Sequence, residues 1–219
     1  DDLRVTNPPT NPELLDALAE RFVASGYDLR DLVRTICTSS TYGLSSTPTE
    51  SNRLDRQNCS SFQPRRMTAE VFYDAINQSL GTQATFAGLP KGTTAVQLPD
   101  NGFNDYFLTV FGKPEASSAC ECERNPEANL AQSLHLLNSQ DVQGRLQNAS
   151  GLASSLAKDE GGDTGALVER LYLRAYSRRP TDAEKRAVTE HVAGAADARQ
   201  AWEDVLWAIL NTKEFQFVW

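Results

Sequence analysis

The stretch AWEDVLWAIL, residues 201–210, decides the fold class of this 219-residue chain. Its large apolar residues recur at intervals of three and four, at Trp202, Val205, Leu206, Ile209 and Leu210. Side chains at these intervals lie one above another on a single helix face. A helix with such an apolar face must bury it against other elements. The stretch therefore predicts a helix that packs into a multi-helix core.

Other parts of the chain repeat this pattern and add capping signals. Asn11 followed by Pro12 is typical of a helix start, and Thr181 with Glu184 forms a capping box. We predict a mainly α fold, an irregular multi-helix bundle that forms a single domain. Its expected regions are a helical part over 1–81, an irregular part over 82–128 and a helical part over 129–219.

Two segments break the helical pattern. Residues 43–64 are polar and carry two prolines without periodicity, which predicts a long loop of the kind that is usually functional or mobile. Residues 82–128 are rich in glycine and proline. Within them we expect a short strand around Ala95–Leu98 as part of a minor β-hairpin, and a short aromatic helix over 104–111.

The charge balance excludes some partners. The chain has a net charge of -8 and a pI near 4.8, whereas nucleic-acid binding needs clustered Lys and Arg. No apolar run approaches the roughly 20 residues that span a bilayer, so we expect no membrane insertion by this segment. Because the chain begins at Asp1 without an initiator Met, we expect it to be a piece of a longer protein.

Four cysteines, Cys37, Cys59, Cys120 and Cys122, leave several alternatives open. The close pair is separated by one residue, which fits neither the usual zinc ligand spacing nor a haem attachment motif. Cys120 and Cys122 could form a metal or redox element, or either could pair with Cys37 or Cys59 in a disulfide. Cys37 lies beside an apolar helix stripe, where a buried free thiol is the simpler interpretation.

Charged residues form two candidate ligand-binding groups, each with a structural alternative. The candidates are Arg65, Arg66, Glu70, Glu121, Glu123 and Arg124. Paired arginines can clamp a carboxylate or sulfate, although such residues more often form salt bridges with neighbouring acids. Asp100, Asn104 and Asp105 surround a glycine and supply the oxygen ligands that calcium prefers. A turn held by side-chain bonds to the backbone accounts for the same three residues.

The histidines and tryptophans on the expected helices are interpreted as structural residues, not as catalytic or sugar-binding residues. His135 lies in an apolar helix and is expected in or near the core, whereas His191 is expected to be exposed. Trp202 and Trp207 both fall in the last long helix, and we interpret them as core residues instead of a sugar platform. The nucleophile-elbow, Walker and dinucleotide fingerprints do not occur in the sequence.

Four phrases carry a family resemblance. They are TNPPTNPELLDALAERFVASGYDLRDLVRTICTSSTYGLSS (6–46), PRRMTAEVFYDAI (64–76), ACECERNPEANLAQSLHLLNS (119–139) and LVERLYLRAYSRRPTDAEKRAV (167–188). Together they resemble the C-terminal two-thirds of the planctomycete-type PSD1 domain of unknown function (DUF1553). The resemblance implies an extracytoplasmic parent, at the periplasm or cell surface, with haem c in upstream regions and none in this segment. It implies no activity and transfers no catalytic residues.

The leading hypothesis is a non-catalytic helical interaction or scaffolding module of an exported, cytochrome-c-linked multidomain protein. Its partners would be upstream domains of the same polypeptide, a polysaccharide or another exported protein. One alternative is part of an extracytoplasmic enzyme that acts on polysaccharide, with two carboxylates in acid–base roles. Another is a metal or redox element at Cys120 and Cys122.

Overall fold

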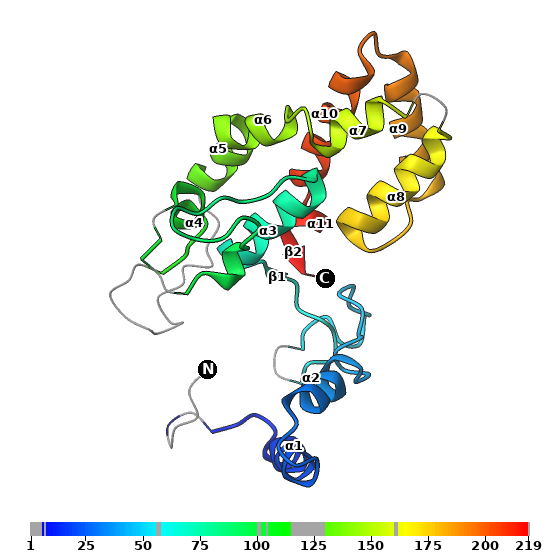
Figure 1. Ribbon diagram of the computed structural model, residues 1–219. Helices are drawn as coiled ribbons and strands as arrows, with labels where there is room; N and C mark the ends of the chain where they lie inside the picture. Colours follow the sequence, from blue (N-terminus) through cyan, green and yellow to red (C-terminus); the bar gives the residue numbers. More distant parts are fainter. Residues whose placement is uncertain are drawn as a thin grey trace. The chain divides into compact units, whose positions relative to one another are not determined.

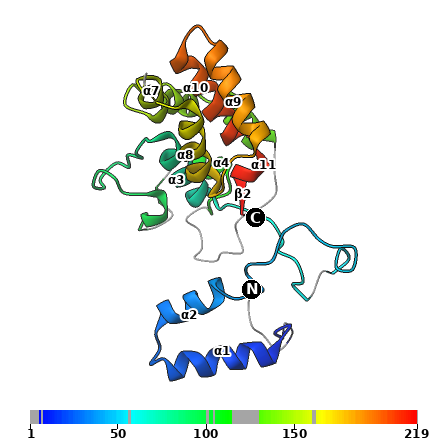
Figure 2. The same ribbon diagram turned by 90° about the vertical axis from the view of Figure 1, so that its right-hand side faces the viewer.

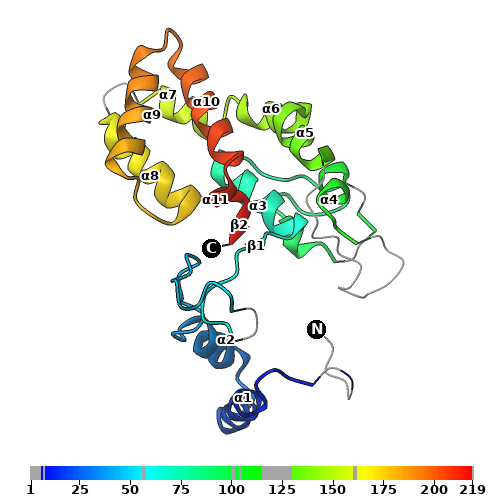
Figure 3. The same ribbon diagram turned by 180° about the vertical axis from the view of Figure 1, so that it is seen from behind.

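The computed structural model describes residues 6, 8–55, 58–99, 102–103, 105–114, 130–159 and 162–218. Its contacts divide the chain into two compact units. The N-terminal unit extends to Arg65, and the larger unit comprises Arg66–Val218. Figures 1, 2 and 3 show the ribbon from three sides.

The N-terminal unit contains two short helices, α1 (Pro12–Ala24) and α2 (Leu29–Cys37), that contact each other (Figure 1). The predicted cap at Asn11 is confirmed, because its side chain accepts the Leu14 N–H, and Asp28 caps α2 in the same way. An ion pair of 3.1 Å joins Arg21 of α1 to Asp31 of α2. Neither helix has a buried residue, so the contact between them does not create a core.

The rest of this unit forms the predicted loop. Residues 38–55 and 58–64 have turns and bends but no helix or strand. The Asp55 side chain accepts the backbone N–H groups of Asn58 and Ser60, and the rings of Tyr42 and Phe62 meet edge to face. These local contacts give the described loop residues a defined course without an apolar core.

The larger unit is a bundle of helices, which confirms the mainly α fold (Figure 1). Its elements are β1 (Arg65–Arg66, at the unit boundary), α3 (Ala69–Leu80), η1 (a 3₁₀-helix, Ala95–Gln97), α4 (Tyr106–Val110), α5 (Leu130–Asn138), α6 (Gln140–Leu146), α7 (Leu152–Ala157), α8 (Thr164–Tyr176), α9 (Asp182–Gly194), α10 (Ala198–Leu210), α11 (Lys213–Gln216) and β2 (Phe217–Val218). None of the helices that the structure describes is long and apolar enough to cross a bilayer.

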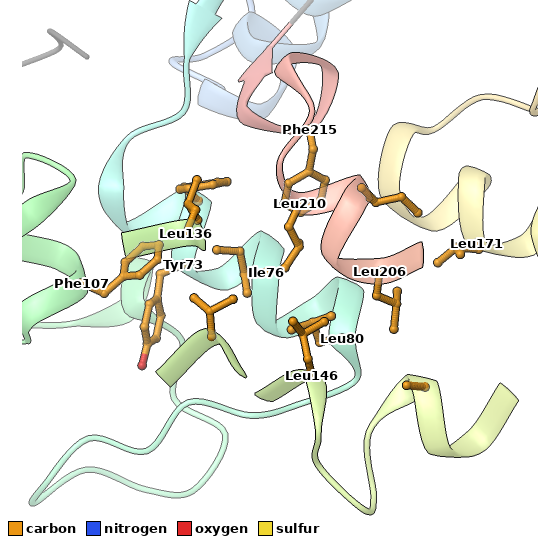
Figure 4. Packing of buried hydrophobic residues seen from close by; sticks show 14 of the residues in the cluster. Tyr73, Ile76, Leu80, Phe107, Leu136, Leu146, Leu171, Leu206, Leu210 and Phe215 are labelled. Atoms are coloured by element: carbon orange, nitrogen blue, oxygen red, sulfur yellow. The ribbon is translucent and has the colours of Figure 1, made fainter. Parts of the chain in front are cut away.

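The core forms where α3 meets α10 and the helices around them (Figure 4). Phe72 of α3 lies 5.2 Å from Phe111 and 6.0 Å from Phe215, measured between ring centroids. The residues labelled in Figure 4 converge from α3, α4, α5, α6, α8, α10 and α11; they are Tyr73, Ile76, Leu80, Phe107, Leu136, Leu146, Leu171, Leu206, Leu210 and Phe215. The predicted apolar stripe of α10 is therefore confirmed as a core face.

The strand expected around Ala95–Leu98 is wrong, because Ala95–Gln97 is a 3₁₀-helix. Asp74 of α3 accepts the N–H groups of Ala95 and Val96 at 2.7 and 3.0 Å, and Thr94 with Gln97 forms a capping box. A carboxylate that bonds two successive amides stabilises the start of a helical turn. The described sheet pairs β1 with β2 and lies outside residues 82–128.

Candidate ligand-binding site

A cavity of about 510 Å³ lies among α8, α9 and α10. Figure 3 shows these three helices at one end of the larger unit. The walls are mostly apolar and include the rings of Tyr172, Tyr176 and Trp207. A volume in this range is typical of small-molecule sites. The amphipathic faces of three helices meet here without filling the space between them.

The inner end of this cavity has its polar groups already paired. The Tyr176 hydroxyl lies 3.0 Å from Thr212 Oγ1, which itself donates to the Ile209 carbonyl at 2.8 Å. Thr212 Oγ1 also accepts the Phe215 N–H. Burial raises the pKa of Tyr176 to about 12, so its hydroxyl stays protonated at neutral pH. This end of the cavity therefore favours an apolar group over a charged one.

A second cavity, of about 410 Å³, adjoins the first along α10. Its lining is polar and comes from α5, α6 and α10; it comprises Leu137, Gln143, Leu146, Gln147, Gln200, Glu203, Asp204 and Trp207. Asp204 and Trp207 line both cavities. The two cavities are hereafter the apolar recess and the amide groove, and together they form the Trp207 cleft.

Ion pairs hold the polar walls of the cleft in place. Arg199 donates through Nε to Glu203 at 2.9 Å and through Nη2 to the Gln147 carbonyl at 2.5 Å. His191 Nε2 lies 3.5 Å from an Asp204 carboxylate oxygen across the mouth of the recess. Both side chains of this pair are about half exposed. Glu203 thus has its partner on the same helix, and Asp204 has His191 of α9 beside it.

Arg178 fixes the helices that bound the recess. It donates to Glu184 at the start of α9 and to Glu214 of α11, and its guanidinium lies over the rings of Tyr172 and Tyr176. Hydrogen bonds from Arg178 lower the pKa of Glu184 to about 2. A guanidinium bonded to two carboxylates on separate helices constrains their relative positions.

A second polar network lies between α3 and α6. Arg145 of α6 donates to the Tyr73 hydroxyl at 2.6 Å, to Asp141 at 3.0 Å and to the Asn77 side chain. Burial raises the pKa of Tyr73, although the positive charge of Arg145 works in the other direction. The guanidinium also lies 4.5 Å from the centroid of the Tyr73 ring. These bonds join α3 to α6.

The histidine predicted near the core is there. His135 is buried beside the rings of Tyr106, Phe107 and Phe111. Burial lowers its pKa below the ordinary value of 6.5. Its neutral form is therefore the folded form at neutral pH. His191, by contrast, is exposed as predicted and borders the recess.

The structure places the two arginines of the predicted clamp in different surroundings. Arg66 donates to the Gln132 side chain and lies over the Phe111 ring, so it links β1 to α5. Arg65 is exposed, and Glu70 is buried at the start of α3. Burial and pairing within the fold explain Arg66, which is the structural alternative given above. Glu121, Glu123 and Arg124 lie outside the described residues.

The calcium candidates are only partly described. Asp100 and Asn104 lie outside the described residues, and Asp105 is the N-cap of α4, where its side chain accepts the Leu108 N–H at 3.1 Å. The part of the chain that the structure describes contains no group of three or more His, Cys, Asp or Glu placed to hold a metal. The capping role of Asp105 fits the turn interpretation.

Two of the four cysteines are described, and both are free and exposed. The interpretation of Cys37 as a buried thiol is therefore wrong, because α2 has no buried face. Cys59 adopts a left-handed backbone conformation with φ of 52° in the loop organised by Asp55. Cys120 and Cys122 lie outside the described residues, so their pairing stays a prediction.

The sequence assigned Trp207 to the core, and the structure places it at the edge of the core, where it packs against the buried cluster. Trp202 is buried, but Trp207 is half-buried and lines both cavities. Trp207 falls five positions after Trp202 and so lies off the apolar stripe of α10. That offset was the available signal. The partners that build the cleft come from α5, α6, α8 and α9, and no local pattern relates them.

The larger unit is a helical bundle with two adjoining cavities of ligand size, the apolar recess and the amide groove. The chain belongs to the PSD1 family, described as proteins of unknown function (DUF1553), whose family model matches residues 1–101 and 93–192. No curated protein and no solved structure matches the chain. The match to the family model confirms the resemblance that the sequence analysis described.

Proposed function

We propose that this chain is a non-catalytic helical interaction module of an exported, cytochrome-c-linked multidomain protein. In this proposal the larger unit, which contains the apolar core, folds without a partner. The helices α1 and α2 dock on another domain of the same polypeptide. The extracytoplasmic setting and the haem-bearing neighbour rest on the family resemblance.

The observation that carries the docking proposal is the exposed apolar surface of α1 and α2. Leu14 and Val23 of α1 are 55% and 56% exposed, and Leu29 and Val33 of α2 are 65% and 58% exposed. Fully burying one such side chain contributes about 1.5–3 kcal/mol. Two short helices without a buried residue gain little stability by themselves. A partner surface that covers these side chains would supply the missing stabilisation.

The engagement of the charged groups supports a binding role. The two oxygens of Asp74 accept backbone amides of η1, and Arg66 is bonded to Gln132. Acid–base catalysis would need titratable groups directed together at a substrate. The Trp207 cleft instead presents apolar walls and carboxylates that already have basic partners. This arrangement favours holding a ligand over transforming it.

Site-specific photo-crosslinking in the complete exported protein tests the docking role. A photoreactive phenylalanine analogue would replace Val33 on the apolar face of α2, and the matched control would place it at Arg30 on the same helix. We expect Val33 to crosslink to a neighbouring domain and Arg30 to give little product. Peptide mapping identifies the partner segment.

Crosslinks from Val33 that fall on residues 66–218 of the same chain would contradict the proposal, since the two units would then pack on each other. Equal crosslinking from both positions would also contradict it. The enzyme and the Cys120–Cys122 redox alternatives stay predictions. The redox alternative can be tested by measuring the intact mass after alkylation without reductant. Each thiol that is not in a disulfide would add one alkyl group to the mass.

A further inference from the structure

The Trp207 cleft has a chemistry more specific than that of a general binding surface. The amide groove carries three glutamine side chains, Gln143, Gln147 and Gln200, together with Glu203 and Asp204. Each amide can both donate and accept hydrogen bonds, and each carboxylate accepts them. The side chains that line the groove include no Lys or Arg. A ligand for this lining must therefore be rich in groups that donate and accept.

The charges of the cleft exclude some ligand classes. Two carboxylates at the groove and a net charge of -8 disfavour an anionic ligand. A strongly cationic ligand gains less at Glu203, because this carboxylate is already bonded to Arg199, and His191 lies 3.5 Å from Asp204. A neutral polyhydroxylated ligand fits best. Hydroxyl groups can bond the glutamines and carboxylates without disturbing these ion pairs.

Trp207 adds an aromatic residue to the hydrogen-bonding groups of the cleft. Trp207 lines both the amide groove and the apolar recess, and it is half-buried. Sugar rings combine a face of C–H groups with hydroxyls at the ring edge. The C–H face can pack on an aromatic ring while the hydroxyls reach planar polar side chains. A tryptophan next to three glutamines matches this pairing of an apolar face with a polar edge.

The recess adds a preference among sugars. Beyond Asp204 and Trp207, the recess is lined by apolar residues such as Val188 and Ala208. The Tyr176 and Thr212 hydroxyls in this part of the wall are bonded to each other. An N-acetyl substituent would place its methyl group in this recess. Its N–H would lie at the junction of the cavities, where Asp204 can accept a hydrogen bond. A sugar without a substituent would leave the recess unfilled.

We propose that the Trp207 cleft binds an oligosaccharide that contains N-acetylated sugars, with the chain in the amide groove and an acetyl group in the apolar recess. The site lies wholly within α5–α10 and Thr212 of the larger unit. It is independent of the docking role of α1 and α2, so either can fail without the other.

The test is an NMR titration of the full chain with N-acetylglucosamine tetramer, with glucose tetramer as the matched ligand. We expect the indole N–H resonance of Trp207 to shift with the acetylated tetramer, and the glucose tetramer to bind at least about tenfold more weakly. No shift with the acetylated tetramer, or equal binding of both, would overturn the proposal.

Two variants locate the site. Trp207→Ala should weaken binding by about tenfold or more, whereas Tyr106→Ala, at an exposed aromatic ring outside the cleft, should leave it unchanged. Ala208→Leu would narrow the recess from an exposed position and should weaken the preference for the acetylated tetramer. Its control is Ala183→Leu, an exposed alanine of α9 outside the cleft. Unchanged preference in Ala208→Leu with native thermal stability would contradict the acetyl position.

Discussion

The helices α2 and α10 are both amphipathic, but they use their apolar faces differently. Val33 of α2 is 58% exposed, whereas Leu206 of α10 is 1% exposed. Around α10, helices α6, α7, α9 and α11 supply surfaces that cover its stripe. Within the N-terminal unit, α2 contacts α1, and no residue of either helix is buried. An apolar stripe thus shows that a helix needs a partner and does not show where that partner lies.

Removing the central ring of the larger core should have the largest effect. Phe72→Ala deletes a ring packed against Phe107, Phe111 and Phe215, and we expect it to lower the free energy of unfolding by about 3–5 kcal/mol. Val33→Ala is the matched truncation in α2 and should cost less than about 0.5 kcal/mol. Urea denaturation followed by circular dichroism measures both. Similar costs for the two variants would remove the contrast between the units.

Loss of the Arg178 bonds should be the next largest effect. In Arg178→Met, Glu184 loses the guanidinium that holds its pKa near 2, so we expect this pKa to rise toward 4.5. A carboxyl with a lowered folded pKa stabilises the fold above its unfolded pKa and loses this contribution as pH falls. The wild-type chain should therefore lose stability between pH 4.5 and 2 more steeply than the variant. Carbon-13 NMR titration of glutamate side chains checks the pKa directly.

Protonation of His135 should produce a smaller loss at milder pH. Burial lowers its folded pKa, while Asp141 and Asp105 raise it and Arg145 lowers it further. The unfolded chain then binds a proton near pH 6.5 before the folded chain does, so stability should decline as pH falls below 6.5. In His135→Leu the unfolding temperature should vary less between pH 7.5 and 5. An unchanged pH dependence in this variant would contradict the burial argument.

Charged substitutions on the α2 face should have the smallest effect on folding. Leu29→Lys and Val33→Lys together replace two exposed side chains, and we expect the unfolding free energy of the isolated chain to change by less than about 0.5 kcal/mol. Thermal unfolding of the double variant checks this, and Leu206→Lys provides the contrast. A large loss in the double variant would show that this face is already buried by the chain itself.

Much of the larger unit could be predicted because its signals are local. The stripe of α10, the Thr181–Glu184 capping box and the core position of His135 each follow from residues a few positions apart. The 3₁₀-helix at 95–97 could not be predicted in this way. It depends on Asp74, which lies 21 residues earlier and bonds the first amide of the turn.

The candidate site was largely hidden for the same reason. Trp207 was interpreted as a core residue, and no local pattern singles out the glutamines that line the groove. Arg178 joins Glu184, six residues away, to Glu214, 36 residues away. Cavities arise from the packing of several helices, and periodicity within one helix carries no information about the space left between two. The exposed position of Cys37 likewise depends on a partner that α2 lacks within its own unit.

Hydrogen exchange of the isolated full chain, followed by mass spectrometry, tests the contrast between the units most directly. We predict that the amides of α3 and α10 exchange only with global unfolding, whereas those of α1 and α2 exchange at least ~100-fold faster because no core protects them. Equal protection of all four helices would contradict the account. The N-terminal helices would then be buried by the chain itself and would not be available to dock on another domain.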